Sequence, residues 1–141
     1  MSGVHEQSIK YMEEYMETHG LTFLSNGNRE VYLKWLRNLK PGDEVCYEYG
    51  DILASKRKIK YVKVERITPS GWIKTTDGKY FYTSGQMRGG IYYEYLNPVT
   101  RKVKELDARR RAANFLNDFD FHQLDAEDLY QVLSIVQKTT G

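Results

Sequence analysis

The sequence predicts an α+β fold in which a small barrel of about five antiparallel strands lies between N-terminal and C-terminal helices. First, β-branched and aromatic residues recur in short runs over residues 39–96, and a turn residue bounds each run. Second, apolar residues on both sides of this stretch recur at helical spacing. Third, 141 residues suffice for one domain with its own core, so we expect a single barrel with helical attachments.

The N-terminal segment, residues 1–38, is predicted to hold two amphipathic helices. Apolar residues recur at helical spacing over residues 8–19, and glutamates lie between them on the solvent face. Asn28 is placed to cap the second helix, whose apolar stripe runs to Leu39. Pro41 then ends the helical pattern.

Residues 39–99 are predicted to form the barrel. Apolar and polar residues alternate over residues 44–49, which is the period of a half-buried strand. Over residues 58–67 the alternation slips, so we expect a β-bulge or a sharp bend near Tyr61. The single cysteine, Cys46, falls inside the first strand and is expected to be a small buried side chain.

Turn residues define the remainder of the barrel. Residues 72–76 and 79–83 are predicted to pair as a hairpin, because the Asp-Gly pair at 77–78 tolerates the positive φ angles of a tight turn. Residues 91–96 would form the last strand, and the Asn-Pro pair at 97–98 would stop it.

Residues 100–141 are predicted to be a helical tail packed on the barrel. Thr100 would cap a helix that runs to about Phe115 or Leu116, and Asp125 would cap a final helix. The apolar stripe of the final helix, which is expected to be buried, comprises Leu129, Val132, Leu133 and Val136.

The net charge of +2 conceals a strong segregation of charge along the chain. Residues 1–55 hold 5 Lys or Arg against 9 Asp or Glu, and residues 112–141 hold 1 against 5. Residues 56–111 hold 15 Lys or Arg against 5 Asp or Glu. A basic middle between acidic ends indicates something about the partners of a protein rather than about its fold.

The basic middle is the candidate nucleic-acid-binding surface, because cations meet phosphates and aromatic faces stack on bases. The first strip of cations comprises Lys56, Arg57, Lys58, Lys60, Lys63, Arg66 and Lys74. Arg88 lies apart from it, in a Gly-rich loop that could add a contact or be simply a long turn. The second strip comprises Arg101, Lys102, Lys104, Arg109, Arg110 and Arg111. Aromatic contacts would come from Tyr61, Trp72, Tyr80, Tyr82, Tyr92 and Tyr93. Together on one face, the two strips would form a nucleic-acid footprint.

Two other interpretations of these residues stay open. The cations could merely solvate exposed strand faces or pair with the acidic helices, since surface ion pairs of this kind are common and individually weak. The tyrosines could instead build a protein-binding surface, because tyrosine offers contact area with few rotors to freeze. Half of the tyrosines in any strand must nevertheless point inward.

No pattern typical of catalysis or of metal binding is present. His5, His19 and His122 are far apart, and the chain has no nucleophile elbow, Walker motif or dinucleotide-binding motif. Residues 118–125 contain three aspartates and a histidine, but Gln123 and Leu129 occupy the positions where a calcium loop needs Gly and Glu. We therefore expect a protein that is not an enzyme and holds no metal or cofactor.

Residues 39–45, which contain Pro-Gly-Asp, and residues 64–73, which contain Val-x-x-Ile-Thr-x-x-Gly, are followed by the Asp-Gly pair and Phe81. These motifs resemble those of the small SH3-like or KOW-type barrels of short phage and prophage proteins. The resemblance covers about residues 39–137 and implies an SH3-like barrel, a fold that is a binding module in most cases.

The resemblance, together with the charge pattern, implies a non-catalytic accessory protein of a phage or mobile element that contacts nucleic acid or a nucleoprotein complex. The alternative is a protein-binding inhibitor of a host defence enzyme, of the anti-CRISPR type. The chain lacks a signal-peptide pattern and any apolar run long enough to span a bilayer, so we expect it in the cytoplasm of the host cell.

Overall fold

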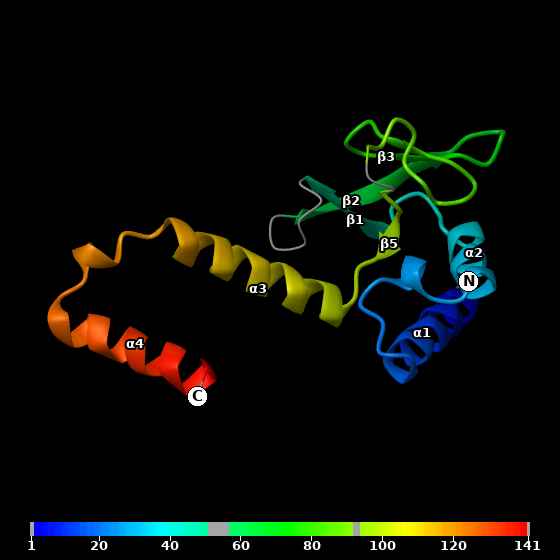
Figure 1. The fold of residues 1–141 in the computed structure, drawn as a ribbon. Helices are drawn as coiled ribbons and strands as arrows, with labels where there is room; N and C mark the ends of the chain where they lie inside the picture. Colours follow the sequence, from blue (N-terminus) through cyan, green and yellow to red (C-terminus); the bar gives the residue numbers. More distant parts are fainter. Residues whose placement is uncertain (1, 51–56, 92–93, 141) are drawn as a thin grey trace.

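The computed structural model describes residues 2–50, 57–91 and 94–140 (Figure 1). The helices are α1 (Ser2–Thr18), α2 (Arg29–Arg37), α3 (Arg101–Asp118) and α4 (Ala126–Thr140), with 3-10 turns at Leu24–Asn26 and Phe121–Gln123. The strands are β1 (Glu44–Gly50), β2 (Arg57–Ile67), β3 (Ile73–Thr75), β4 (Tyr80–Phe81) and β5 (Asn97–Pro98). The α+β class predicted from the sequence is confirmed. None of the described helices is long and apolar enough to cross a membrane.

The five strands form an antiparallel sheet in the order β4-β3-β2-β1-β5. This sheet is open, with β4 and β5 at its edges, so the closed barrel expected from the sequence is not confirmed. The physical reason is strand length, because β4 and β5 have two residues each. Between them lie isolated bridges that pair Phe81 with Met87 and Gln86 with Tyr95.

The strand predicted over residues 91–96 is displaced: among the residues of this range that the structure describes, Tyr95 forms an isolated antiparallel bridge with Gln86. Pairing with β1 falls on Asn97 and Pro98, the residues expected to stop the strand, and residues 92–93 lie outside the described part of the chain. Pro98 lies opposite Val45. Proline lacks an N–H group and is tolerated on an edge strand, which is where β5 lies.

The bulge predicted near Tyr61 is misplaced. β1 and β2 pair in continuous register through Tyr61, which lies opposite Cys46. The register shifts instead between Val64 and Arg66, where β2 pairs with β3. The alternation slips around Tyr61 for another reason: β2 contributes Ile59 to a cluster on one side of the sheet and Val64 to the core on the other side.

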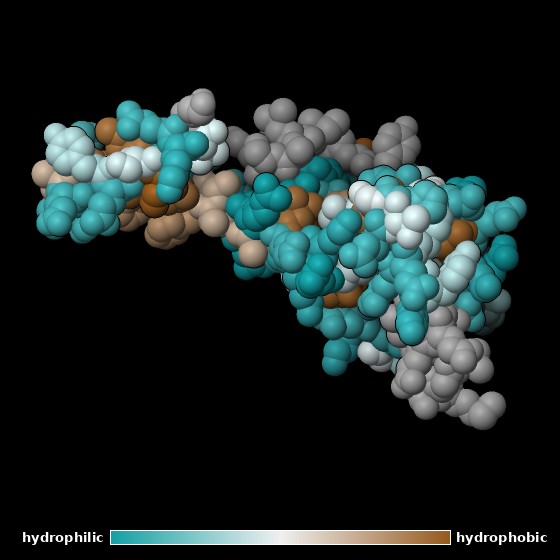
Figure 2. All heavy atoms as spheres, turned by 90° about the horizontal axis from the view of Figure 1, so that it is seen from below, coloured by the Kyte–Doolittle hydropathy of each residue, from teal (hydrophilic) through white to brown (hydrophobic). Residues whose placement is uncertain are grey.

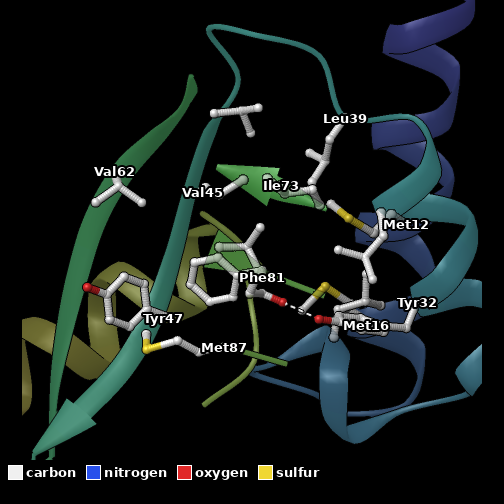
Figure 3. Close-up of a cluster of buried hydrophobic side chains, with 14 residues drawn as sticks. Met12, Met16, Tyr32, Leu39, Val45, Tyr47, Val62, Ile73, Phe81 and Met87 are labelled. Carbon is white, nitrogen blue, oxygen red and sulfur yellow. Dashed lines mark hydrogen bonds between the residues drawn. The ribbon is translucent and has the colours of Figure 1, made fainter. Parts of the chain in front are cut away.

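The main core lies between the sheet and helices α1 and α2 (Figure 3). Met12 and Met16 of α1 and Tyr32 of α2 belong to it, together with strand residues such as Phe81, which is fully buried. The Tyr32 hydroxyl donates a hydrogen bond of 2.6 Å to the backbone carbonyl of Leu96. The N-terminal helices therefore share one core with the sheet.

A second cluster lies on the other side of the sheet, beneath α3. It brings together Phe23, Cys46, Ile59 and Val103 of α3. Cys46 is buried, as predicted, and burial raises the pKa of its thiol to about 12. Strands β1 and β2 are therefore covered on both sides, by α1 and α2 on one and by the first half of α3 on the other.

The helix caps predicted from the sequence are confirmed. Asn28, Thr100 and Asp125 each accept a hydrogen bond from a backbone N–H two or three residues further along the chain. Each cap satisfies a donor that the first turn of a helix leaves without an intrahelical partner. Helix α1 differs from the prediction in starting at Ser2 rather than at residue 8.

The C-terminal tail packs on the sheet only in part. Val103 of α3 is fully buried, but α3 continues beyond the sheet and α4 turns back outside the body of the molecule (Figure 1). The stripe of α4 predicted to be buried is exposed by 39% at Leu129, 46% at Leu133 and 53% at Val136. Periodicity identified the apolar face correctly but says nothing about which surface covers it.

Candidate nucleic-acid interface

The candidate site lies on the side of β3 and β4 that faces away from the main core. Ile73 and Phe81 lie opposite each other and belong to the main core. Successive side chains of a strand point to opposite faces of the sheet. Lys74 and Tyr80, which also lie opposite each other, are therefore on the outer face.

A β-bulge brings Arg66 to this outer face. Val64 is buried in the main core, so regular alternation would turn Arg66 inward as well. The register shift at Glu65 instead sets Arg66 opposite Lys74. The Nη2 atom of Arg66 then donates a hydrogen bond of 3.3 Å to the Tyr80 hydroxyl.

Two further rings and a third cation extend the site. Trp72 and Tyr82 pack edge to face with their ring centroids 5.1 Å apart. The Arg88 guanidinium carbon lies 5.4 Å from the centre of the Trp72 ring, and the Lys74 ammonium lies 5.9 Å from that of Tyr80. We call this set the aromatic–basic face; it comprises Arg66, Trp72, Lys74, Tyr80, Tyr82 and Arg88.

The chemistry of the aromatic–basic face suits a flexible polyanion with flat bases. Arg66 and Arg88 are exposed and, within the part of the chain that the structure describes, neither lies within 4 Å of a carboxylate. Their guanidinium groups can donate paired hydrogen bonds to a phosphate. The three rings are half-buried, so each is held in place while part of it stays open to stack on a base.

Glu65 partly neutralises the positive charge of the aromatic–basic face. Glu65 lies 2.9 Å from the Lys74 ammonium, and both side chains are partly exposed. An ion pair at the surface contributes little to stability, so a phosphate can compete with Glu65 for the lysine. Of the three cations, the two arginines would therefore be the stronger ligands for a phosphate.

The outer side of β2 continues toward α3 through Lys63 and Tyr61. The Tyr61 hydroxyl donates a hydrogen bond of 2.9 Å to Asp107, and Arg111 Nε donates one of 3.0 Å to the other oxygen of that carboxylate. Burial, then the hydrogen bond to Asp107, raises the pKa of Tyr61 to about 12. Among the predicted cations of α3, Arg111 is therefore linked to the outer side of β2 through Asp107.

Two predicted phosphate ligands are structural instead. Arg110 Nη1 lies 2.6 Å from Glu48 Oε2, and Arg57 Nε lies 3.8 Å from the same oxygen. Little of either arginine side chain is exposed. These ion pairs join α3 to the β1–β2 hairpin, so Arg57 and Arg110 are not free to meet a ligand.

Lys58 and Lys60 lie on the opposite side of β2 from Lys63. They pair in register with Tyr49 and Tyr47, on the side of the sheet that faces the main core. They extend beyond that core and remain exposed. The three lysines therefore cannot form one contact surface.

The cations of α3 point in several directions. Arg101 pairs with Glu105 at 3.5 Å, and Lys102 lines a surface pocket with two glutamates of α1. Lys104 and Arg109 are exposed. The two predicted strips of cations therefore do not lie on one face of the molecule. Of the second strip, Arg111 lies near the outer side of β2, through its contact with Asp107.

The sequence predicted the members of the aromatic–basic face but not their grouping. Lys56, Tyr92 and Tyr93 lie outside the described residues. One residue that sequence reasoning missed is Glu65, whose bulge position decides where Arg66 points. The sequence held no clear signal for this bulge, because Lys58 and Lys60 also share the side of Val64 and remain exposed there.

Asp77, in the turn between β3 and β4, is a second polar centre that the sequence analysis did not single out. It accepts hydrogen bonds from the Tyr47 hydroxyl at 2.6 Å and the Thr75 hydroxyl at 2.5 Å, and it lies 3.4 Å from the Lys60 ammonium. Burial alone would raise the pKa of Asp77, but these hydrogen bonds outweigh it and hold the pKa below its ordinary value of 3.8.

Replacing Asp77 by asparagine is expected to make the free energy of unfolding change less with pH in the acid range. Because the folded-state pKa is depressed, the stability that Asp77 contributes is present above pH 3.8 and is lost as the pH falls through the folded-state value. At pH 7 the variant should be less stable by about 1 kcal/mol. Urea unfolding of both proteins from pH 7 down to acid checks this, and an unchanged gap between them across that range would contradict it.

Comparisons with protein-family models, with curated proteins and with solved structures found no match for this chain. Function is therefore inferred from the residues and their geometry.

Proposed function

We propose that the protein is a non-catalytic binding protein whose aromatic–basic face contacts single-stranded nucleic acid, either free or within a nucleoprotein complex. The observation that carries the proposal is the grouping of three cations among three partly exposed rings on one side of β3 and β4. Such a face combines the two interactions that single strands offer, phosphate charge and unpaired base faces.

A single strand fits this face better than a duplex. Stacking on Trp72, Tyr80 or Tyr82 needs a base whose face is open, and the bases of a duplex are stacked on one another. Each base–aromatic stack contributes about 1–3 kcal/mol and tolerates any base. We therefore expect little sequence preference.

The fold-level part of the proposal is that the open sheet is a variant of the SH3-like barrel of phage and prophage proteins. The bridges of Phe81 with Met87 and of Gln86 with Tyr95 support it, since they lie between the two edge strands. In this proposal the chain is an accessory protein of a phage or mobile element and acts in the cytoplasm of its host cell.

The test is binding of a fluorescent oligonucleotide of about 12 nucleotides at low salt, followed by anisotropy. The double variant Arg66→Glu/Arg88→Glu is expected to bind at least about 30-fold more weakly, because each arginine contributes about 1–3 kcal/mol. Both side chains are exposed, so the fold should not change.

The matched control is Lys58→Glu/Arg109→Glu, which changes the net charge equally at exposed positions away from the aromatic–basic face. It should bind within about threefold of the unaltered protein, since only long-range attraction is reduced. Equal losses in the two double variants, or no binding by the unaltered protein, would refute the proposal.

A protein-binding inhibitor of a host defence enzyme is the second candidate. Trp, Tyr and Arg, which make up most of the aromatic–basic face, are also the residue types enriched at binding hot spots of protein interfaces. In that case the oligonucleotide would not bind, and a host protein recovered with the chain would be lost with the Arg66→Glu/Arg88→Glu variant.

A further inference from the structure

The end of α3 and the whole of α4 form an arm that extends away from the sheet (Figure 1). In Figure 2 hydrophobic residues, in brown, lie among hydrophilic ones on this arm, at the left of the molecule. The large exposed apolar side chains of the arm are Phe115, Leu116, Leu129, Tyr130, Leu133, Ile135 and Val136. Ile135 is exposed by 67% and Phe115 by 66%. So much apolar surface is characteristic of an interaction site.

The apolar side chains of α4 occupy more than half of its circumference. At about 100° per residue, Leu133 lies close to the line of Leu129, whereas Tyr130 lies about 100° to one side of it and Ile135 about 120° to the other. A helix that is apolar around so much of its surface is a buried helix with more than one neighbour. A single flat partner would leave one flank uncovered.

The area of the arm matches what a stable pair of proteins needs. Each of its seven large apolar side chains exposes on the order of 100 Å². Their sum is roughly 700 Å², close to the about 800 Å² that each partner contributes to an interface of standard size. One copy of the arm therefore supplies about half of such an interface, and a second copy supplies the other half.

The charges at the two ends of α4 favour one orientation. Glu127 and Asp128 lie in its first turn and Lys138 in its last turn. Antiparallel pairing of two copies sets each acidic end near the basic end of its partner and keeps the acidic ends apart. A two-fold axis generates this arrangement.

We propose that the arm is a homodimer interface, in which two copies of the chain pair about a two-fold axis and each α4 lies between the α4 and the α3 end of its partner. This arrangement supplies the two neighbours that the wide apolar face of α4 requires. It does not depend on the proposed function, because the aromatic–basic face lies on the sheet.

The test is the mass of the full chain in solution, measured by light scattering or sedimentation over micromolar concentrations. We expect twice the monomer mass of 16.6 kDa. Leu133→Glu puts a charge in the middle of the apolar face and should raise the dimer dissociation constant by at least about 100-fold. Leu133 is exposed in the single chain, so the variant should fold, which circular dichroism checks.

The matched control is Gln131→Glu, which adds the same charge on the same helix at an exposed polar position. Gln131 lies about 160° around the helix from Leu133, so this variant should remain dimeric. A monomer at every concentration would overturn the proposal, as would a Leu133→Glu variant that still forms the dimer. Open-ended association that grows with concentration would contradict a closed two-fold pair.

Discussion

Replacing Phe81 by alanine is expected to destabilise the fold by about 3–5 kcal/mol, the range for an aromatic side chain removed from a packed core. Phe81 is fully buried, and its ring centroid lies 5.5 Å from that of Tyr47. This loss is a large part of the total stability, because the folded state of a domain is stable by only about 5–15 kcal/mol. The substitution should also disturb the candidate site, since Tyr80 and Tyr82 are the chain neighbours of Phe81 and Tyr80 belongs to β4.

Urea unfolding followed by tryptophan fluorescence measures this loss. The control is Tyr11→Ala, an aromatic removed from the surface of α1 where its side chain is 54% exposed. The control should change the free energy of unfolding by no more than about 0.5–1 kcal/mol. Similar losses in the two variants would mean that Phe81 is not at the centre of the core.

Replacing Glu48 by glutamine is expected to destabilise the protein by about 2–4 kcal/mol. The change leaves Arg57 and Arg110 without their shared carboxylate in a partly buried site beneath α3. Breaking a fully buried ion pair costs about 3–5 kcal/mol, and the value here is lower because the Glu48 side chain is 23% exposed. Glutamine keeps the shape, so the loss reports charge rather than packing.

The control for Glu48 is Glu105→Gln, which removes the partner of Arg101 on the exposed side of α3. That pair is open to solvent and should contribute less than about 0.5 kcal/mol. Thermal or urea unfolding of the two variants separates a structural ion pair from a surface one. Equal stabilities would show that α3 is held to the sheet by its apolar contacts alone.

Local chemistry was predictable from the sequence. The caps Asn28, Thr100 and Asp125 follow from side chains that satisfy the first donors of a helix. The Asp-Gly turn at residues 77–78 joins β3 and β4 in the register that sets Lys74 opposite Tyr80. The position of the turn was predictable but its length was not, because a two-residue Asp-Gly turn would set Lys74 opposite Phe81. The backbone N–H of Thr75 instead donates to the carbonyl of Lys79, which makes the turn one residue longer and shifts the register.

Features that depend on contacts distant in sequence were not predictable. The alternation of apolar residues in β2 is irregular near Tyr61 because α3 covers one side of that strand and the main core lies on the other. The bulge itself lies at Glu65 and shows only in the pairing of β2 with β3. The sequence pattern predicted Arg110 as a surface cation, but its side chain donates a hydrogen bond to Glu48, which is 62 residues away in the chain. The exposed stripe of α4 has the same period as a buried one, because periodicity carries no information about the neighbour.

The salt dependence of oligonucleotide binding tests the central proposal most directly. Each phosphate neutralised on a single strand releases counterions and adds about −0.7 to the slope of log affinity against log salt. Three cations on the aromatic–basic face therefore predict a slope of about −2, and Arg88→Ala should reduce it by about 0.7. Affinity that does not change with salt, or a slope that Arg88→Ala leaves unaltered, would contradict a polyanion bound at this face.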